Sequence, residues 1–297
     1  MPYPDYTVHQ AEQIADNLYS FKCNSSGFLG VQLQVAEPTS LRLGFDEILS
    51  GERVNPGRMG CYAYVTYELQ PGTYTLESFE PYTMKFMEVY VDKGSCQVER
   101  VYMRDYCGSD VKRATFQCDN EEANELFEAA RETHRQNAVD IFMDCPSRER
   151  AGWLCDSYFS GRAEAFFTGK NLVEKSFLEN YARYETRPGL PEKMLPMCYP
   201  ADQYQGKYIP NWSMWYILEL QKYVERTGDT EMKDLSEAKV RGLVEFFEKY
   251  ENEYGLLENL DGWIFVEWSK CNHADYVAGL NFPSNMLWAA ALEAAAQ

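Results

Sequence analysis

The hydrophobic and polar positions divide the chain into two parts with different periods. From residue 18 to about residue 105, hydrophobic residues alternate with polar ones, and turn residues separate the runs. Alternation of this kind predicts strands with one face in a core and the other in solvent. The predicted strands cover residues 27–36, 40–47, 62–69, 73–79, 84–91 and 97–105.

Short strands separated by turns such as Pro71-Gly72 and Lys93-Gly94 are typical of an antiparallel β-sandwich. We assign residues 18–112 to this sandwich domain. The first 17 residues follow neither period, and we interpret residues 1–17 as a short helix or as the remnant of an upstream unit.

After Cys118 the period becomes that of a helix. Asp119 is a candidate N-cap with Glu122 as its capping-box partner, and Gly228 is suited to a helix C-cap. Residues 113–297 are therefore expected to form antiparallel helical hairpins. Helices are predicted from residue 119 onward and at 157–168, 171–185, 212–227, 230–250 and 284–296, with long connections at 138–156, 186–211 and 251–283. Connections that long inside a helical array are usually functional.

Composition and charge narrow the classes of function. The net charge is −18 with a pI of about 4.6, which disfavours nucleic acid as a partner because its phosphates would be repelled. No apolar run approaches the ~20 residues of a membrane span, and residues 1–20 lack the pattern of a secretory signal. Aromatic residues make up 15% of the chain, which suits sugar binding through ring stacking.

The cysteines give little sign of a metal site. There are nine, with no C-x-x-C pair, so we expect neither a metal nor another cofactor. Thiols without a pairing pattern favour a reducing compartment, which favours the cytoplasm over the periplasm.

The first long connection carries the candidate chemistry, in the sequence DCPSRERAGWLCD over residues 144–156. Three carboxylates, two arginines and one tryptophan share these thirteen residues, and apolar runs flank them on both sides. A solvated charged loop is the alternative interpretation. Charges brought close to a core, however, are normally paired or take part in chemistry.

This stretch resembles the D-C-P-x-R-(D/E)-E/R-x-G-W-x-G-D motif of the bacterial α-L-rhamnosidases, which are inverting glycosidases with a six-hairpin toroid. The order and spacing of its carboxylates, Arg148, Gly152 and Trp153 fit one version of the motif. Three further segments resemble the same family: residues 79–91 its last β-domain strands, 209–215 its I-P-D-(W/F)-S helix start, and 255–268 its G-L-L…W-x-F-(I/V)-D-W loop.

The resemblance implies a fold and a set of residue roles. The fold would be an antiparallel β-sandwich followed by part of an (α/α)6 barrel. Glu149 would be the general acid that protonates the glycosidic oxygen, which requires a raised pKa. Asp144 and Asp156 would raise that pKa while Arg148 and Arg150 oppose them. The residues implied in sugar binding are Asp144, Arg148, Trp153, Asp156, Trp212, Trp263, Glu267 and Trp268.

Three positions depart from the family pattern: Ser147 replaces a common Gln, Cys155 a usual Gly, and Glu267 a common Asp. Cys155 is expected to disturb the loop backbone, because glycine alone takes positive φ freely. An inverting enzyme also needs a second carboxylate as base. In the resembling family that base lies beyond position 297, so we expect this chain to be a fragment that is inactive alone, with Glu267 as the local alternative.

The sequence therefore predicts a hydrolase that releases terminal α-L-rhamnosyl residues from a rhamnosylated oligosaccharide or glycoside. Uncovered apolar helix faces would also make self-association possible. Two alternatives remain open. One is another six-hairpin glycosidase, such as a fucosidase or a glucosidase, and the other is a carbohydrate-binding relative without turnover.

Overall fold

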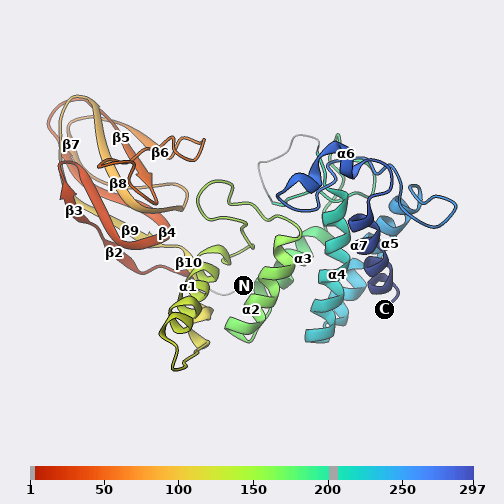
Figure 1. Cartoon of the computed structure of the whole chain (residues 1–297). Helices are drawn as coiled ribbons and strands as arrows, with labels where there is room; N and C mark the ends of the chain where they lie inside the picture. Colours follow the sequence, from red (N-terminus) through yellow and green to blue (C-terminus); the bar gives the residue numbers. More distant parts are fainter. Residues whose placement is uncertain (1–3, 201–206) are drawn as a thin grey trace.

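The computed structural model describes residues 4–200 and 207–297, with strands in the first part of the chain and helices in the second (Figure 1). The strands are β1 (Pro4–Asp5), β2 (Val8–Gln10), β3 (Glu12–Ala15), β4 (Leu18–Val35), β5 (Thr39–Asp46), β6 (Tyr64–Leu69), β7 (Gly72–Glu77), β8 (Tyr82–Lys93), β9 (Cys96–Asp105) and β10 (Cys107–Gly108). The helices are η1 (Asp110–Arg113), α1 (Glu121–Asn137), α2 (Asp156–Thr168), α3 (Leu172–Ala182), α4 (Pro210–Thr227), α5 (Thr230–Glu248), η2 (Lys270–Asn272), α6 (Ala274–Val277) and α7 (Phe282–Ala295).

Strand β4 organises the sheet. All described pairings are antiparallel, as predicted, and the order along the sheet is β2-β9-β4-β8-β5-β6. The first half of β4 pairs with β3 and β8, and its second half pairs with β9 and β7. The change of partners comes near Gly27, where pairing with β8 ends and pairing with β9 begins. An irregularity between Ser20 and Ser25 lies within the pairing with β8, and such an irregularity bends a strand locally.

A single core lies under these strands. Alternate residues of β4, namely Leu29, Val31 and Leu33, are fully buried, and they share a hydrophobic cluster with residues from β5, β8 and β9. The alternation read from the sequence is thus the alternation between this core and the opposite face.

The structure of the amino-terminal segment differs from the short helix considered from the sequence. Residues 4–15 do not form the short helix considered for them, because β1, β2 and β3 pair with β10, β9 and β4. Strands β2 and β3 are exposed throughout and carry mainly polar residues, so they lack the alternation that marks a half-buried strand. Residues 1–3 of the segment assigned to 1–17, and residues 201–206 of the connection expected at 186–211, lie outside the described residues.

Helix α4 is central to the helical part, where it contacts α2, α3, α5 and α7. Both faces of α4 are buried, including Met214, Tyr216 and Ile217, which accounts for its largely apolar sequence. It ends at Gly228 in the left-handed conformation, as predicted. Helix α1 is capped by the Asn120 side chain rather than by Asp119. Among the described residues, no helix has the length and apolar character needed to cross a bilayer.

Hydrogen bonds between buried side chains join the sheet to the helices. The hydroxyl of Thr83 on β8 lies 2.6 Å from that of Ser26 on β4 and donates to the carbonyl of Pro146 at 2.7 Å. Ser26 in turn donates to Gln136 at the end of α1. The connection from α1 to α2 therefore lies between the sheet and the remaining helices (Figure 1).

Candidate active site

The 144–156 loop is built into the helical core through its second half. Its backbone pairs with residues 197–199: the amide of Leu154 donates to the carbonyl of Met197 at 3.1 Å, and that of Tyr199 donates to Gly152 at 3.0 Å. The carbonyl of Gly152 also accepts from the buried hydroxyl of Tyr181 at 2.9 Å. A Cβ on Gly152 would lie 2.6 Å from the carbonyl oxygen of Tyr199, so the approach requires glycine.

The sheet holds the first half of the loop through Arg150. Its guanidinium donates to the carbonyl of Pro81 and to Glu80 at 2.7 Å, and it lies 5.1 Å from the ring centre of Tyr82. Together with the bond from Thr83 to Pro146, these contacts fix residues 146–150 against the start of β8. Glu149 is therefore positioned by the sheet as well as by the helices.

Asp144 and Glu149 form a closely coupled pair. Burial, together with a hydrogen bond to Glu149, raises the pKa of Asp144 to about 7. The bond with Asp144 and the ion pair with Arg148, at 2.6 Å, lower the pKa of Glu149. The pair thus holds one proton near neutrality, and in this arrangement the proton is on Asp144.

The pKa of Glu149 differs from the expectation, and the directions of the two arginine side chains show which of them acts on Glu149. The raised pKa expected of Glu149 is found on Asp144 instead. The two arginines act differently, because Arg148 points at Glu149 while Arg150 points to the sheet. Of the two arginines, only Arg148 therefore adds to the effect of Asp144 in lowering the pKa of Glu149.

Asp156 begins α2 beside the pair. Its side chain reaches solvent, yet the surrounding protein desolvates it and raises its pKa to about 6. The negative charge of Glu149 contributes to the same rise, so the two carboxylates sense each other. The structure accordingly brings Asp144, Glu149 and Asp156 into one electrostatic group.

A run of aromatic rings leads away from Trp153. Its ring centre lies 5.2 Å from that of Trp212, which lies 5.4 Å from Phe265. Phe265 contacts Trp263 at 5.4 Å and Trp268 at 5.0 Å. Trp153 and Trp212 are buried, whereas Trp268 is 83% exposed, so only the far end of the run offers ring faces to a ligand.

Residues 111–285, more than half of the chain, match the model of the bacterial α-L-rhamnosidase six-hairpin glycosidase domain. The chain belongs to this family. The matched range contains the whole 144–156 loop and the aromatic run. No curated protein sequence matches the chain.

Solved rhamnosidases share the fold. A rhamnosidase of a Bacillus strain superposes with a TM-score of 0.82 at 19% identity, covering 96% of this chain and 30% of its own. A Klebsiella oxytoca rhamnosidase with rhamnose bound gives 0.74 at 16% identity, covering 99% of this chain and 64% of its own. A Streptomyces avermitilis α-L-rhamnosidase complexed with L-rhamnose gives 0.69 at 18%, covering 98% and 29%. The chain therefore spans about a third to two thirds of these relatives.

Glu267 stands apart from the three carboxylates in its contacts. It is exposed, and its contacts are local, with the thiol of Cys271 and with the side chain of Asn272. It lies between Phe265 and Trp268 of the aromatic run, in the connection between α5 and α7.

Sequence reasoning missed one buried carboxylate next to the site. Glu219 of α4 is 1% exposed and accepts a 2.5 Å hydrogen bond from Ser157, the residue after Asp156. Burial raises the pKa of Glu219 well above its usual range, so it is a neutral acid that supports the start of α2. A lone Glu between Leu218 and Leu220 is the signal that would have revealed it.

The carboxylate pair also defines the one possible metal-ligand group among the described residues. Asp144, Cys145 and Glu149 offer ligand atoms that all lie within 4.8 Å of one another. Glu149 is already ion-paired with Arg148, and the raised pKa of Asp144 disfavours the ionised carboxylate that a metal would need.

Cys155 takes a positive φ, which glycine adopts more freely than any other residue. Its φ is 75° and its ψ −52°, a strained conformation for any residue with a Cβ. Backbone strain therefore lies at the residue that replaces the family's usual glycine.

We predict that the usual order of Ala and Gly in stability is reversed at this position. Cys155→Gly should be more stable than Cys155→Ala by about 1 kcal/mol, because both variants lose the thiol and only Ala keeps the strained Cβ. Urea unfolding of the two variants measures the difference. An alanine variant at least as stable as the glycine variant would show that the backbone at residue 155 is unstrained.

Proposed function

We propose that this chain is the acid-bearing part of an inverting α-L-rhamnosidase, which releases terminal α-L-rhamnosyl residues from oligosaccharides or glycosides. The supporting observation is the 144–156 loop, in which Glu149 lies between two desolvated carboxylates inside the segment that matches the family. Two relatives of the same fold have rhamnose bound, which agrees with a sugar of this kind as the ligand.

In this proposal Glu149 protonates the glycosidic oxygen and the paired carboxyl of Asp144 holds the proton beforehand. Arg148 keeps Glu149 ionised while the site is empty. Its side chain is 49% exposed, so it is free to turn from Glu149 to a sugar hydroxyl. Loss of that ion pair raises the pKa of Glu149, and the proton passes across the hydrogen bond from Asp144 to the acid.

The remaining residues of the site bind the sugar. Asp144, Arg148 and Asp156 present charged groups that accept or donate hydrogen bonds to hydroxyls. Trp153 forms the wall between them and the aromatic run. Rhamnose is a 6-deoxy sugar, and the exposed rings of Trp263 and Trp268 are suited to its methyl group.

The general base is assigned to a carboxylate outside residues 1–297. Inversion requires a base ~6.5–9.5 Å from the acid, on the opposite face of the sugar ring. Glu267 is the alternative within the chain. Among the described residues, its exposed side chain accepts only from the thiol of Cys271, and we assign it to sugar binding in this proposal.

We predict that Glu149→Gln in the complete enzyme lowers kcat/KM by ~10²–10⁴ for leaving groups that need protonation. An aryl rhamnoside with a nitrophenolate leaving group should lose much less, because that group departs without a proton. Steady-state kinetics on both substrates measure the difference.

Glu267→Gln is the matched control for this experiment, with a smaller loss expected on both substrates. Equal losses for the two leaving groups in Glu149→Gln would remove Glu149 from the acid role. A loss in Glu267→Gln as large as that in Glu149→Gln would instead make Glu267 the base.

Two other functions remain as alternatives to this proposal. Another six-hairpin glycosidase would share the carboxylates but hydrolyse a different sugar, which a screen of aryl glycosides of several sugars detects. A binding relative would retain affinity for the sugar without turnover. The three carboxylates in the 144–156 loop favour an enzyme over a binding protein.

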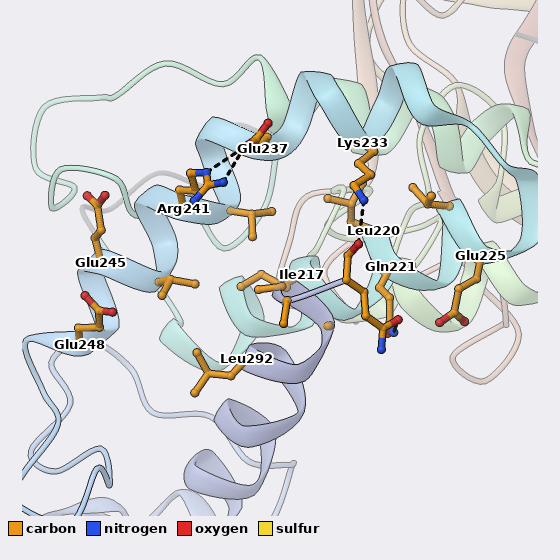
Figure 2. Close-up of a pocket in the computed structure, with 17 residues that line it drawn as sticks. Ile217, Leu220, Gln221, Glu225, Lys233, Glu237, Arg241, Glu245, Glu248 and Leu292 are labelled. Atoms are coloured by element: carbon orange, nitrogen blue, oxygen red, sulfur yellow. Dashed lines mark hydrogen bonds and ion pairs between the residues drawn. The ribbon is translucent and has the colours of Figure 1, made fainter.

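We propose also that further helices complete an (α/α)6 toroid against α4, α5 and α7. A groove of about 740 Å³ lies between these helices (Figure 2). The apolar side chains of Ile217, Leu220 and Leu292 line it, and charged groups such as Lys233 and Arg241 surround them (Figure 2). An apolar surface of this kind favours a packed partner over solvent.

The chain purified alone should therefore self-associate through this groove at micromolar concentrations. Leu292→Glu should shift sedimentation toward the monomer because it places a charge in the groove, whereas Leu126→Glu, on the exposed face of α1, should not. A wild-type chain that sediments as a monomer at these concentrations would contradict the proposal.

A further inference from the structure

The connection from α5 to α7 carries the exposed tryptophans of the aromatic run on little regular structure of its own. Its helical segments are η2 and α6, of three and four residues. Buried backbone groups outside helices and sheets need other hydrogen-bond partners. The side chains of Asn211, Asn272 and Asn285 supply such partners to this connection.

Asn285 and Asn272 hold the two ends of the segment from Leu257 to Glu267. On α7, Asn285 accepts from the amide of Leu257 at 2.7 Å and donates to the carbonyl of the same residue at 2.9 Å. Asn272 accepts from the amide of Val266 at 2.7 Å and donates to the carbonyl of Glu267. A side-chain amide that both accepts and donates replaces the backbone partner that a neighbouring strand would supply.

Asn211 holds the centre of the aromatic run. It is 3% exposed, and its Oδ1 accepts from the amide of Phe265 at 3.3 Å. Because a backbone amide can only donate, the oxygen of Asn211 faces Phe265 and its Nδ2 group faces Ser284, to which it donates at 2.8 Å. Ser284 is fully buried in the first turn of α7. The Asn211 side chain therefore joins α4, α7 and the connection through one bond as acceptor and one as donor.

Capping of α4 does not account for this asparagine. Helix α4 begins at Pro210 after Ile209, whose side chain makes no capping bond, and the two bonds of the Asn211 amide go to other parts of the chain. The next residue, Trp212, places its ring centre 5.4 Å from that of Phe265. The first turn of α4 thus holds Phe265 both by its backbone and by its ring.

Phe265 in turn lies between the two exposed tryptophans. Its ring meets those of Trp263 and Trp268 edge to face, at 5.4 and 5.0 Å between ring centres. Packing against Phe265 therefore restricts two rings that otherwise face solvent. A restricted ring loses less entropy on binding a ligand than a mobile one does. The position of Phe265 accordingly influences how these ring faces meet a ligand.

We propose that Asn211 is a positioning residue for ligand binding, because its side-chain amide fixes Phe265 and, through it, the faces of Trp263 and Trp268. The consequence for a sugar rests on the proposed function, in which these two rings contact the methyl group of a rhamnosyl residue. The role requires one acceptor and one donor on the same side chain. A neutral carboxyl group of the same shape has both, whereas an ionised carboxylate has no donor.

Asn211→Asp makes this requirement switchable by pH. Burial disfavours the charged form, so the introduced carboxyl group should hold a proton at acidic pH and lose it as the pH rises. The neutral form keeps an acceptor for Phe265 and a donor for Ser284, and the ionised form keeps the acceptor alone. In a chain labelled with 5-fluorotryptophan, the fluorine-19 signals of Trp263 and Trp268 should therefore match the wild type while the carboxyl is neutral. They should move with its carbon-13 titration.

Binding of methyl α-L-rhamnoside to the whole chain, measured by NMR titration, is the functional readout. Compared with the wild type at the same pH, Asn211→Asp should bind equally well when neutral. When ionised it should bind about three- to tenfold more weakly, the range that corresponds to one hydrogen bond. Asn124→Asp is the matched control, because Asn124 on α1 likewise accepts from the amide and donates to the carbonyl of Cys118, both at 2.9 Å. It should change neither the tryptophan signals nor the affinity.

A change that reverses on protonation of the same variant separates positioning from misfolding. Wild-type affinity in Asn211→Asp while its carboxyl is ionised overturns the positioning role and leaves the proposed function intact. An affinity that is lowered equally in the neutral and ionised forms overturns it too, because the loss would not depend on the donor. A wild-type chain that does not bind methyl α-L-rhamnoside overturns the sugar-binding part of the proposed function. Tryptophan signals that follow the carboxyl would in that case still establish that Asn211 positions the rings.

Discussion

Desolvation of neighbouring carboxylates in the 144–156 loop is the constraint on which the site depends. Two carboxyl groups joined by a hydrogen bond do not both ionise at neutral pH unless water or cations compensate them. Arg148 compensates Glu149, so the proton stays on Asp144. The loop must be held rigidly for this balance to persist. Pairing with residues 197–199 holds one side, and the bonds from Thr83 and Arg150 to Pro146 and Pro81 hold the other.

The sheet therefore helps to position the 144–156 loop as well as preceding the helices in sequence. Arg150 connects the 144–156 loop to Glu80 and Tyr82, and the same residues line a groove beside Glu149. The side chains that fix the loop therefore also shape the surface beside it. On the helical side, Glu219 supports the start of α2 through Ser157. The site thus draws on both parts of the chain.

Local patterns predicted most elements, and long-range contacts account for what they missed. Strands β5 to β9 and helices α2, α3, α4, α5 and α7 follow the sequence period within a few residues, because burial on one face imposes it. Strand β4 begins nine residues before the predicted strand, and α6 lies in a segment that was predicted as a connection. Strands β2 and β3 were missed because pairing with β9 and with the start of β4 stabilises them without burying their side chains. The carboxylates of the site were identified by type, but the directions of Arg148 and Arg150 depend on Glu149 and on a sheet segment 70 residues away.

Carbon-13 NMR of the side-chain carboxyl groups, followed through a pH titration, tests the central claim most directly. The account predicts that Asp144 takes up its proton with a midpoint near pH 7. It also predicts that Glu149→Gln lowers this midpoint, since the hydrogen bond to a charged partner is lost. Ionisation of both Asp144 and Glu149 by pH 5 would contradict the account, because the pair would then hold no proton for the acid to deliver.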